Sequence, residues 1–413
     1  MEILIENIKS LLQADRGTTA MIQGKDMAYI PAIDDSWLLI KDGIIEDYGP
    51  MDKSPGKAET TIDASGKLVM PAFCDPHTHL VYAGSREKEY IDKIRGLSYE
   101  EIAKRGGGIN NSAKLLRETT EDSLYGQSMK RIHEIISFGT GAVEIKSGYG
   151  LDTGAELKML RVIKRIRENS QVEVRSTFLG AHSVPLEYRG RQAEYVDKVI
   201  NEMLPEVGEE GLADFVDVFC DRGFFTVEET DRILKAAAGL GMRAKIHANE
   251  LDFSGGIQVG VKNRALSVDH LEFTGRDEIE ALRGSGTMPT LLPGAAFFLG
   301  MDWPPARLMI DSGLPVALAT DFNPGSSPNG DMKLIMSLAC IKMRMLPAEA
   351  LNAATLNAAY AMGVENELGS IDRGKKANII ITKEIPGLEY LPYAYGSYLI
   401  DRVILNGKIM VNG

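Results

Sequence analysis

Short apolar runs alternate with long amphipathic stretches through the middle of the chain. Residues 154–169 and 227–241 repeat apolar positions at helical spacing and predict helices. The shorter runs are apolar at consecutive positions, which is typical of strands buried on both faces of a parallel sheet. Eight such runs occur, at residues 68–75, 141–147, 172–182, 214–221, 242–248, 266–270, 287–292 and 315–321. This alternation predicts a (β/α)8 TIM-like barrel, which we expect over residues 69–361.

A doubly wound open sheet is the other common arrangement of alternating strands and helices. Its dinucleotide-binding form carries a glycine-rich turn after the first strand, and no such turn follows residues 68–75. We therefore favour the barrel for the middle of the chain.

Both ends of the chain consist of short apolar runs separated by turn residues. The N-terminal part has hairpin-like triplets at 41–43 and 64–66, and only its opening stretch, residues 3–13, shows helical periodicity. Residues 377–382 and 402–413 repeat the β pattern near the other end. Neither end has enough strands to bury a sheet face alone. We expect residues 1–68 and 362–413 to form one small composite β-sandwich domain.

Composition and net charge limit the kinds of molecule that the protein can be expected to bind. The 413 residues are 44% hydrophobic and 25% charged, which is ordinary for a folded protein. A formal net charge of −12 argues against nucleic acid or an anionic membrane surface, although a local arginine can still bind a small anion. The widely spaced Cys74, Cys220 and Cys340 predict no disulfide framework. We expect a cytoplasmic protein with no signal peptide and no membrane span.

The histidines are few and lie mostly at strand ends, where barrel enzymes carry their chemistry. Of six histidines, only His133 falls inside a predicted helix, where a surface or packing role is the default. The other five follow predicted strands: His77, His79, His182, His247 and His270. This distribution points to a functional site at one end of the barrel.

Four of these strand-end positions suit a metal ion. His77 and His79 are one residue apart, so both rings can lie on the same face of an extended strand. With His247 and Asp321 they give three nitrogens and one oxygen, a set that suits zinc or ferrous iron. Alone, His247 could be a core histidine and Asp321 a turn residue. Their combination predicts a metal site.

Two further residues at the same end are candidates for proton transfer. Glu250 follows His247 by three residues, and His270 ends the next strand. A carboxylate and an imidazole beside an activated water can act as general base and general acid. The plainer interpretation of Glu250 is an acidic residue favoured at a helix start. We expect Glu250, helped by His270, to activate the water.

Seven motifs resemble one known family, in the family's order. They are PAFCDPHTHLVYAGSRE at 71–87, GGGI at 106–109, EIKSGYGL at 144–151, TFLGAHSVP at 177–185, IHANE at 246–250, VDHLE at 268–272 and ALATDFNPGSS at 317–327. Together they resemble the imidazolonepropionase family of the metal-dependent amidohydrolase superfamily. The His-x-His pair indicates only the superfamily, whereas EIKSGYGL, FLGAH and DFNPGSS are more specific.

The resemblance implies hydrolytic ring opening of 4-imidazolone-5-propanoate to N-formimidoyl-L-glutamate in histidine degradation. It implies a homodimer and one zinc or iron ion per subunit, held by His77, His79, His247 and Asp321. Superfamily members with two metals bridge them through a modified lysine on the fourth strand, but here that strand ends FCD at 219–221. Glu250 or Asp321 would protonate the leaving nitrogen, and the sequence leaves this choice open.

The substrate implied by the resemblance carries a carboxylate. Arg86 can bind such a group through two hydrogen bonds, although it could instead pair with Glu87 or Glu89 at the surface. Ser326 stands where the family usually has threonine and keeps the hydroxyl. The positions that match the family's substrate contacts, with Arg86, are Tyr149, His182, Glu250, Asn323, Gly325 and Ser326.

Two other functions remain open at this point. A deaminase of a purine, pterin or related heterocycle would use the same metal ligands but would leave the charge of Arg86 unused. A non-catalytic scaffold on the same fold would be expected to lose metal ligands, and all four are present.

The glycine-rich stretch RGGGINNS at 105–112 follows a capping-box pattern, Ser98 to Glu101. A phosphate-binding loop would need a following lysine and hydroxyl residue, and these are absent. We interpret the stretch as a mobile lid over the pocket, with plain loop flexibility as the alternative.

Overall fold

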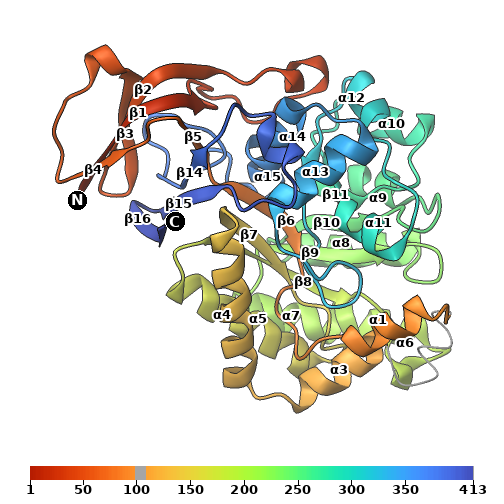
Figure 1. The fold of residues 1–413 in the computed structure, drawn as a ribbon. Coiled ribbons are helices and arrows are strands. Elements are labelled where there is room, and N and C mark those ends of the chain that lie inside the picture. The colour runs from red at the N-terminus through yellow and green to blue at the C-terminus, as the bar shows by residue number, and fades with distance from the viewer. Residues whose placement is uncertain (98–107, 413) are drawn as a thin grey trace.

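The computed structural model describes residues 1–97 and 108–412. These residues form two eight-stranded sheets. In Figure 1 a barrel surrounded by helices lies beside a mixed sheet that is built from both ends of the chain. The prediction of a TIM-like barrel with a small β domain drawn from both chain ends is confirmed.

The barrel strands are all parallel and follow one another in chain order around the sheet. The ring closes where the N–H of His79 donates to the carbonyl of Phe322 and the N–H of Asp321 donates to the carbonyl of His77, both at 3.0 Å. This closure brings the ends of the first and last strands together. The strands are β6 (Phe73–Thr78), β7 (Thr140–Lys146), β8 (Glu173–Ala181), β9 (Phe215–Cys220), β10 (Arg243–Ala248), β11 (Ser267–His270), β12 (Met288–Leu291) and β13 (Ala317–Leu318).

Helices cover the outside of the barrel and follow most of its strands (Figure 1). The helices predicted at 154–169 and 227–241 are present as α5 and α8. In chain order the helices are α1 (Glu87–Ile94), α3 (Ile109–Glu118), α4 (Glu121–Ser137), α5 (Thr153–Asn169), α6 (Gln192–Lys198), α7 (Leu204–Glu209), α8 (Val227–Ala238), α9 (Gly256–Lys262), α10 (Arg276–Leu282), α11 (Pro293–Leu299), α12 (Ala306–Asp311), α13 (Met332–Met343), α14 (Pro347–Ala354), α15 (Leu356–Ala361) and α16 (Tyr390–Tyr393).

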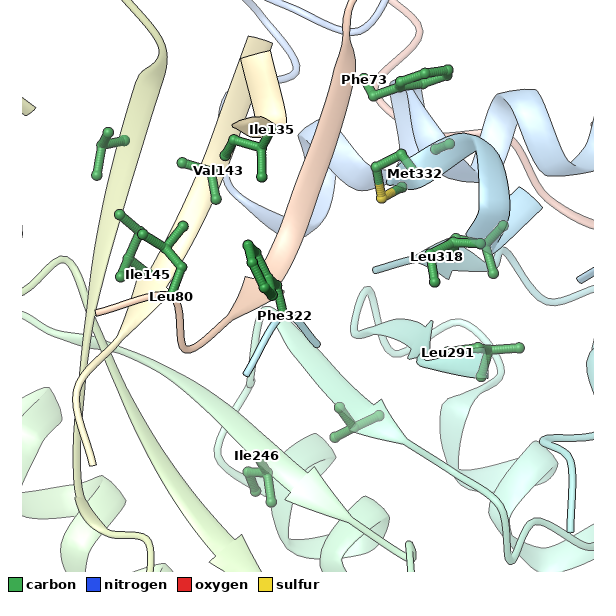
Figure 2. Close-up of a cluster of buried hydrophobic side chains, with 14 of the residues drawn as sticks. Phe73, Leu80, Ile135, Val143, Ile145, Ile246, Leu291, Leu318, Phe322 and Met332 are labelled. Atoms are coloured by element: carbon green, nitrogen blue, oxygen red, sulfur yellow. The ribbon is translucent and has the colours of Figure 1, made fainter. Parts of the chain in front are cut away.

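The barrel strands are buried on both faces, as their continuous apolar runs predict. Every residue of β7 and of β9 is buried. Figure 2 shows part of the apolar cluster between strands and helices, including Val143 and Ile145 of β7, Ile246 of β10 and Leu291 of β12. Full burial of each such side chain contributes about 1.5–3 kcal/mol. The cluster fixes the strands and therefore the residues at their ends.

The mixed sheet runs in the order β16-β15-β14-β5-β1-β2-β3, and β4 pairs with β1. Its own core includes Ile3, Leu38, Ile379 and Ile404, so strands from both chain ends share one apolar cluster. The strands are β1 (Glu2–Leu12), β2 (Ala32–Lys41), β3 (Ile44–Pro50), β4 (Thr60–Asp63), β5 (Lys67–Pro71), β14 (Ile379–Glu384), β15 (Ile400–Leu405) and β16 (Lys408–Asn412).

Strand β1 occupies the stretch whose periodicity looked helical, so a helical interpretation of residues 3–13 is wrong. β1 pairs with β2, β4 and β5 and lies inside the sheet. Ile3, Leu4 and Ile5 are all buried, on both sides of the strand. A strand buried on both faces has consecutive apolar residues, which also match a helical spacing over a short window.

The apolar run at 68–75 is divided between the two sheets. β5 ends at Pro71 and pairs with β1 and β14, whereas β6 begins at Phe73 in the barrel. The N–H of Ala72, between them, donates to the carbonyl of Asn378 at 2.8 Å. The strand that leads to His77 is therefore anchored directly to the mixed sheet.

Candidate active site

The C-terminal ends of the barrel strands surround a cavity of about 440 Å³. His77 does not line it but is fully buried behind it, with its ring centroid 4.4 Å from that of His247. The structure thus brings all the predicted site residues together. Those that line the cavity are His79, Arg86, Tyr149, His182, His247, Glu250, His270, Asp321, Asn323, Gly325 and Ser326.

The four predicted metal ligands converge at the inner end of the cavity. Asp321 Oδ1 lies 3.6 Å from both His77 Nε2 and His79 Nε2. His79 Nε2 lies 3.3 Å from His247 Nε2. Side chains from β6 and the residue after it, from β10 and from the segment after β13 therefore direct their ligand atoms toward one another.

Two buried carboxylates orient the histidine rings from behind. His77 Nδ1 lies 2.6 Å from Asp269 Oδ2, and His247 Nδ1 lies 2.9 Å from Asp217 Oδ2. A carboxylate beside Nδ1 favours the tautomer with the proton on Nδ1, which leaves the Nε2 lone pair facing the cavity. Within the described part of the chain, His77 Nε2 is buried without a hydrogen-bond partner. A lone pair on Nε2 that faces the cavity is the ligand that a metal ion would bind.

The electrostatics of the site also fit a cation. Burial is the largest cause that lowers the pKa values of His77, His79 and His270 well below the usual range. Burial, and then the charge of Glu250, raises the pKa of Asp321 well above its usual value. Neutral imidazoles and a carboxylate without a counter-charge are the groups that a divalent cation stabilises. The residues therefore fit a metal ion.

Glu250 is held beside the metal-ligand candidates by Asp221. Asp221 Oδ2 accepts hydrogen bonds from the N–H groups of Glu250 and Leu251 at 2.7 and 2.9 Å. Glu250 Oε2 lies 3.6 Å from His270 Nδ1. Burial, and then the charge of Asp221, raises the pKa of Glu250 to about 8. A carboxyl group with a pKa near neutrality can both accept and return a proton.

Arg86 directs its guanidinium group toward the cavity. Its Nε donates to Ser112 Oγ of α3 at 2.8 Å, and its Cζ lies 5.7 Å from the centre of the Tyr149 ring. Nη2 is buried, and no described residue accepts a hydrogen bond from it. A Cβ atom on Gly325 would come within 2.4 Å of Nη1, so this glycine leaves room for the group. A guanidinium group in this position can bind a carboxylate.

Asn323 and Ser326 shape the loop that carries Asp321. Asn323 Oδ1 accepts hydrogen bonds from the N–H groups of Gly325 and Ser326, both at 2.8 Å. The hydroxyl of Ser326 donates to Asp321 Oδ2 at 3.2 Å. One carboxylate oxygen of Asp321 is thereby held by the loop, and the other faces the histidines.

His182 and Tyr149 close the side of the cavity next to β7 and β8. His182 Nδ1 lies 3.0 Å from the carbonyl oxygen of Gly148, so this nitrogen carries the donor proton. Burial lowers the pKa of His182 to about 3. Its ring stacks on that of His79, with centroids 5.2 Å apart and planes inclined by 16°. His182 is therefore a neutral ring beside the metal-ligand candidates.

Several supporting residues were not identified from the sequence. Asp217 and Asp269 lie behind the histidines, Lys146 lies between these carboxylates, and Glu272 Oε2 is 3.9 Å from His270 Nδ1. Asp217 and Asp269 do leave a sequence signal, because each is an acidic residue inside an apolar strand, where unpaired charges are rare. Ser112 leaves none, since nothing in the sequence links it to Arg86.

Two further features of the sequence are His133 and the glycine-rich stretch at 105–112. His133 is exposed on α4, away from the cavity lining. Of the stretch RGGGINNS, residues 105–107 lie outside the described residues, as does the Ser98–Glu101 pattern. Gly108 precedes α3, and Ser112 within α3 contacts Arg86. The lid interpretation stays a prediction.

The barrel, the His-x-His strand and the strand-end ligand set define a class of protein, the metal-dependent amidohydrolases. A family model described as "Amidohydrolase family" matches residues 68–410. That range includes the whole barrel, β14, β15 and the first part of β16.

Relatives at high identity narrow this class. An imidazolonepropionase of Christiangramia forsetii is 54% identical over 411 residues, covering 99% of this chain and 100% of that protein. An imidazolonepropionase of Thermoanaerobacter pseudethanolicus is 44% identical over 405 residues, covering 98% of this chain and 96% of that protein. The chain belongs to the amidohydrolase family and, within it, to the imidazolonepropionases.

Solved structures agree on the fold. A triazine hydrolase variant superposes with a TM-score of 0.76 at 16% identity, covering 100% of this chain and 95% of that one. An adenosine deaminase from Xanthomonas campestris with bound zinc gives 0.72 at 17% identity, covering 99% and 93%. The deaminase alternative is not favoured, because the relatives at 39–54% identity are named imidazolonepropionase. None of the helices in residues 1–97 and 108–412 has the length and apolar content needed to cross a membrane.

Proposed function

We propose that this protein opens the ring of 4-imidazolone-5-propanoate by hydrolysis and releases N-formimidoyl-L-glutamate. The observation that carries this proposal is the meeting of four metal-ligand candidates, the guanidinium group of Arg86 and a carboxyl group of raised pKa at one cavity. These groups match a cyclic amide that carries a carboxylate. The names of the relatives support the same reaction.

We assign His77, His79, His247 and Asp321 to one zinc or iron ion per subunit. When bound, the ion supplies a Lewis acid that lowers the pKa of water and polarises a carbonyl group. Three imidazoles and one carboxylate accept either metal. The end of β9, FCD at 219–221, offers no lysine to bridge a second ion, which favours a single-metal site.

Arg86 binds the propanoate carboxylate in this proposal. Its Nη2 is a buried donor without a partner among the described residues, Ser112 accepts from its Nε, and Gly325 leaves room for the guanidinium group. Tyr149 and His182 line the same wall and orient the ring. Because a buried guanidinium without a partner is unfavourable, a substrate that lacks the carboxylate would bind weakly.

Glu250 and His270 handle the protons and the developing charge. Glu250 takes a proton from water as its oxygen adds to the ring carbonyl carbon, and His270 donates a hydrogen bond to the oxygen that gains charge. The ring C–N bond then breaks, and Glu250 returns the proton to the departing nitrogen. Asp321 is less suited to this last role, because Ser326 holds one of its oxygens and the histidines face the other.

Three further properties stay predictions: a homodimer, a cytoplasmic location and the absence of a nucleic-acid partner. Sedimentation of the purified protein measures the first. Metal analysis after purification without added metal decides between zinc and iron.

The direct test is an absorbance assay with freshly generated 4-imidazolone-5-propanoate, comparing wild type with His247→Ala. We expect loss of substrate absorbance, formimidoylglutamate as the product and near-zero activity in the variant. If the metal-replete wild type shows no turnover, the proposed reaction is wrong and heterocyclic deaminase substrates become the next panel.

The role of Glu250 is tested separately with Glu250→Gln. Glutamine keeps the shape but accepts no proton, so we expect kcat to fall by about 10²- to 10⁴-fold with metal content unchanged. Glu278→Gln is the matched control, since Glu278 is a buried carboxylate at the start of α10 that does not line the cavity. Near-normal turnover of metal-loaded Glu250→Gln would show that another group is the base.

A further inference from the structure

Five charged side chains lie together behind the metal-ligand candidates. They belong to four barrel strands, do not line the cavity and are each at most 1% exposed. Lysine, aspartate and glutamate are rarely buried to this extent unless they are paired. Since they do not face the substrate, their role lies inside the protein. The five are Glu144 and Lys146 of β7, Asp217 of β9, Lys245 of β10 and Asp269 of β11.

Lys146 occupies the centre of this buried charge cluster. Its Nζ lies 2.9 Å from Asp217 Oδ2 and 3.6 Å from Asp269 Oδ2. The same Asp217 oxygen contacts His247 Nδ1 at 2.9 Å, and the same Asp269 oxygen contacts His77 Nδ1 at 2.6 Å. One ammonium group therefore links two carboxylates, each of which touches a different metal-ligand candidate.

Glu144 fixes the position of the ammonium group. Its Oε1 accepts hydrogen bonds from Lys146 Nζ at 2.6 Å and from Thr177 Oγ1 at 2.5 Å. Its Oε2 pairs with Lys245, which also donates to the carbonyl of Pro76 at 2.8 Å. Contacts with Glu144, Asp217 and Asp269 thus hold the Lys146 side chain between the two aspartates.

We propose that Lys146 is a positioning residue for the metal, holding Asp217 and Asp269 where they orient His247 and His77. The proposal rests on the metal site assigned above. Two carboxylates this close repel each other strongly in a medium of low dielectric, and the ammonium group between them offsets that repulsion. Without it, the carboxylates separate and the rings lose the partners that direct Nε2 toward the cavity.

The test measures metal affinity without substrate. Zn²⁺ is titrated into the metal-free full-length protein in competition with a chromophoric chelator, for wild type and Lys146→Met. We expect the Kd for Zn²⁺ to rise by about 10- to 100-fold in the variant, the range seen when groups behind metal ligands are removed. The visible absorption of the Co²⁺-loaded protein should change as well, because the ring geometry around the ion changes.

Lys375→Met is the matched control. Lys375 is also a buried lysine, but its Nζ donates to the carbonyls of Glu365 and Leu368, in the chain between the barrel and β14. We expect this control to lower the melting temperature while it leaves the Zn²⁺ Kd and the Co²⁺ spectrum unchanged. A purely structural role of Lys146 would give the same result as the control.

The outcomes separate the two proposals. Failure of the wild type to bind Zn²⁺ would overturn the metal site, whereas wild-type affinity in a folded Lys146→Met variant would overturn only the role of Lys146. If Lys146→Met does not fold, Lys146→Gln takes its place, since its amide can still donate hydrogen bonds to the carboxylates but carries no charge. Weakened Zn²⁺ binding then supports the proposal, and an unchanged Kd overturns it.

Discussion

At the residue scale, Glu250 contributes to how the stability of the metal-free protein changes with pH. Burial, and then Asp221, raises its pKa from 4.5 to about 8. The folded form therefore binds this proton more tightly than the unfolded chain does. The resulting stabilisation is complete below the unfolded pKa and is lost as the pH rises through the folded pKa. In Glu250→Gln no such proton is bound, so the variant should overtake the wild type in stability as pH rises.

Thermal unfolding in the presence of a chelator, at about pH 5, 7 and 9, checks this. The melting temperatures of wild type and Glu250→Gln should be similar at the lowest pH, and the variant should melt several degrees higher at the highest. Because the other titrating groups are present in both proteins, the difference reports Glu250 together with its charge interactions with neighbours such as Asp321. A wild type that gains stability relative to the variant with rising pH would contradict the raised pKa.

The metal-ligand candidates could be predicted from the sequence because they are histidines and an aspartate at the ends of predicted strands. His77 and His79 stand at alternate positions at a strand end, and His247 and Asp321 follow two other strands. The buried charged residues behind these ligands could not be predicted in the same way. Lys146 meets Asp217 and Asp269 only because the closed barrel brings three different strands to one interior layer, and strand order alone does not show which side chains share that layer.

At the element scale, the loop after β7 depends on one carboxylate from the next helix. Glu156 of α5 accepts hydrogen bonds from the N–H groups of Gly148, Gly150 and Leu151 at 2.7–2.9 Å. This loop carries Tyr149 into the cavity. Glu156→Ala leaves the buried donors without an acceptor, at about 1–3 kcal/mol each. We expect a lower melting temperature and a KM at least about tenfold higher.

Glu168→Ala is the control, because Glu168 is exposed on the same helix. Steady-state kinetics and metal analysis of both variants separate a loop effect from metal loss. The metal content of Glu156→Ala should equal that of wild type, since none of the loop's donors belongs to a metal-ligand candidate. A wild-type KM in Glu156→Ala would show that the loop holds its shape without this carboxylate.

Helices and strands were predicted well where the hydrophobic pattern fits only one kind of element. They were predicted less well where a helix and a buried strand share the same pattern. α5 and α8 lie where the helical spacing placed them. β1 has consecutive apolar residues because it is buried on both faces, and this made it look helical. The run at 68–75 reads as one strand, but the chain leaves one sheet at Pro71 and enters the other at Phe73. The local hydrophobic pattern does not show which sheet a strand joins.

At the scale of the whole molecule, the metal should act as a structural link as well as a catalytic group. Its proposed ligands come from β6 and the residue after it, from β10 and from the segment after β13, which are far apart in sequence and meet only in the closed barrel. β6 is also joined to the mixed sheet through Ala72. An ion held by these elements binds the folded protein and not the unfolded chain, so it stabilises the fold in proportion to its affinity.

Metal removal should therefore lower the melting temperature reversibly. With free Zn²⁺ at about 100 times Kd, the stabilisation is about 2.7 kcal/mol, which corresponds to a rise of several degrees for a chain of this size. Differential scanning fluorimetry of chelated protein, before and after Zn²⁺ is restored, measures the shift. His247→Ala should show a much smaller shift, because one ligand is missing and its partner Asp217 is left unpaired on that side. An equal Zn²⁺-dependent shift of the melting temperature in wild type and His247→Ala would mean that the ion binds elsewhere. The assignment of all four ligands would then be wrong.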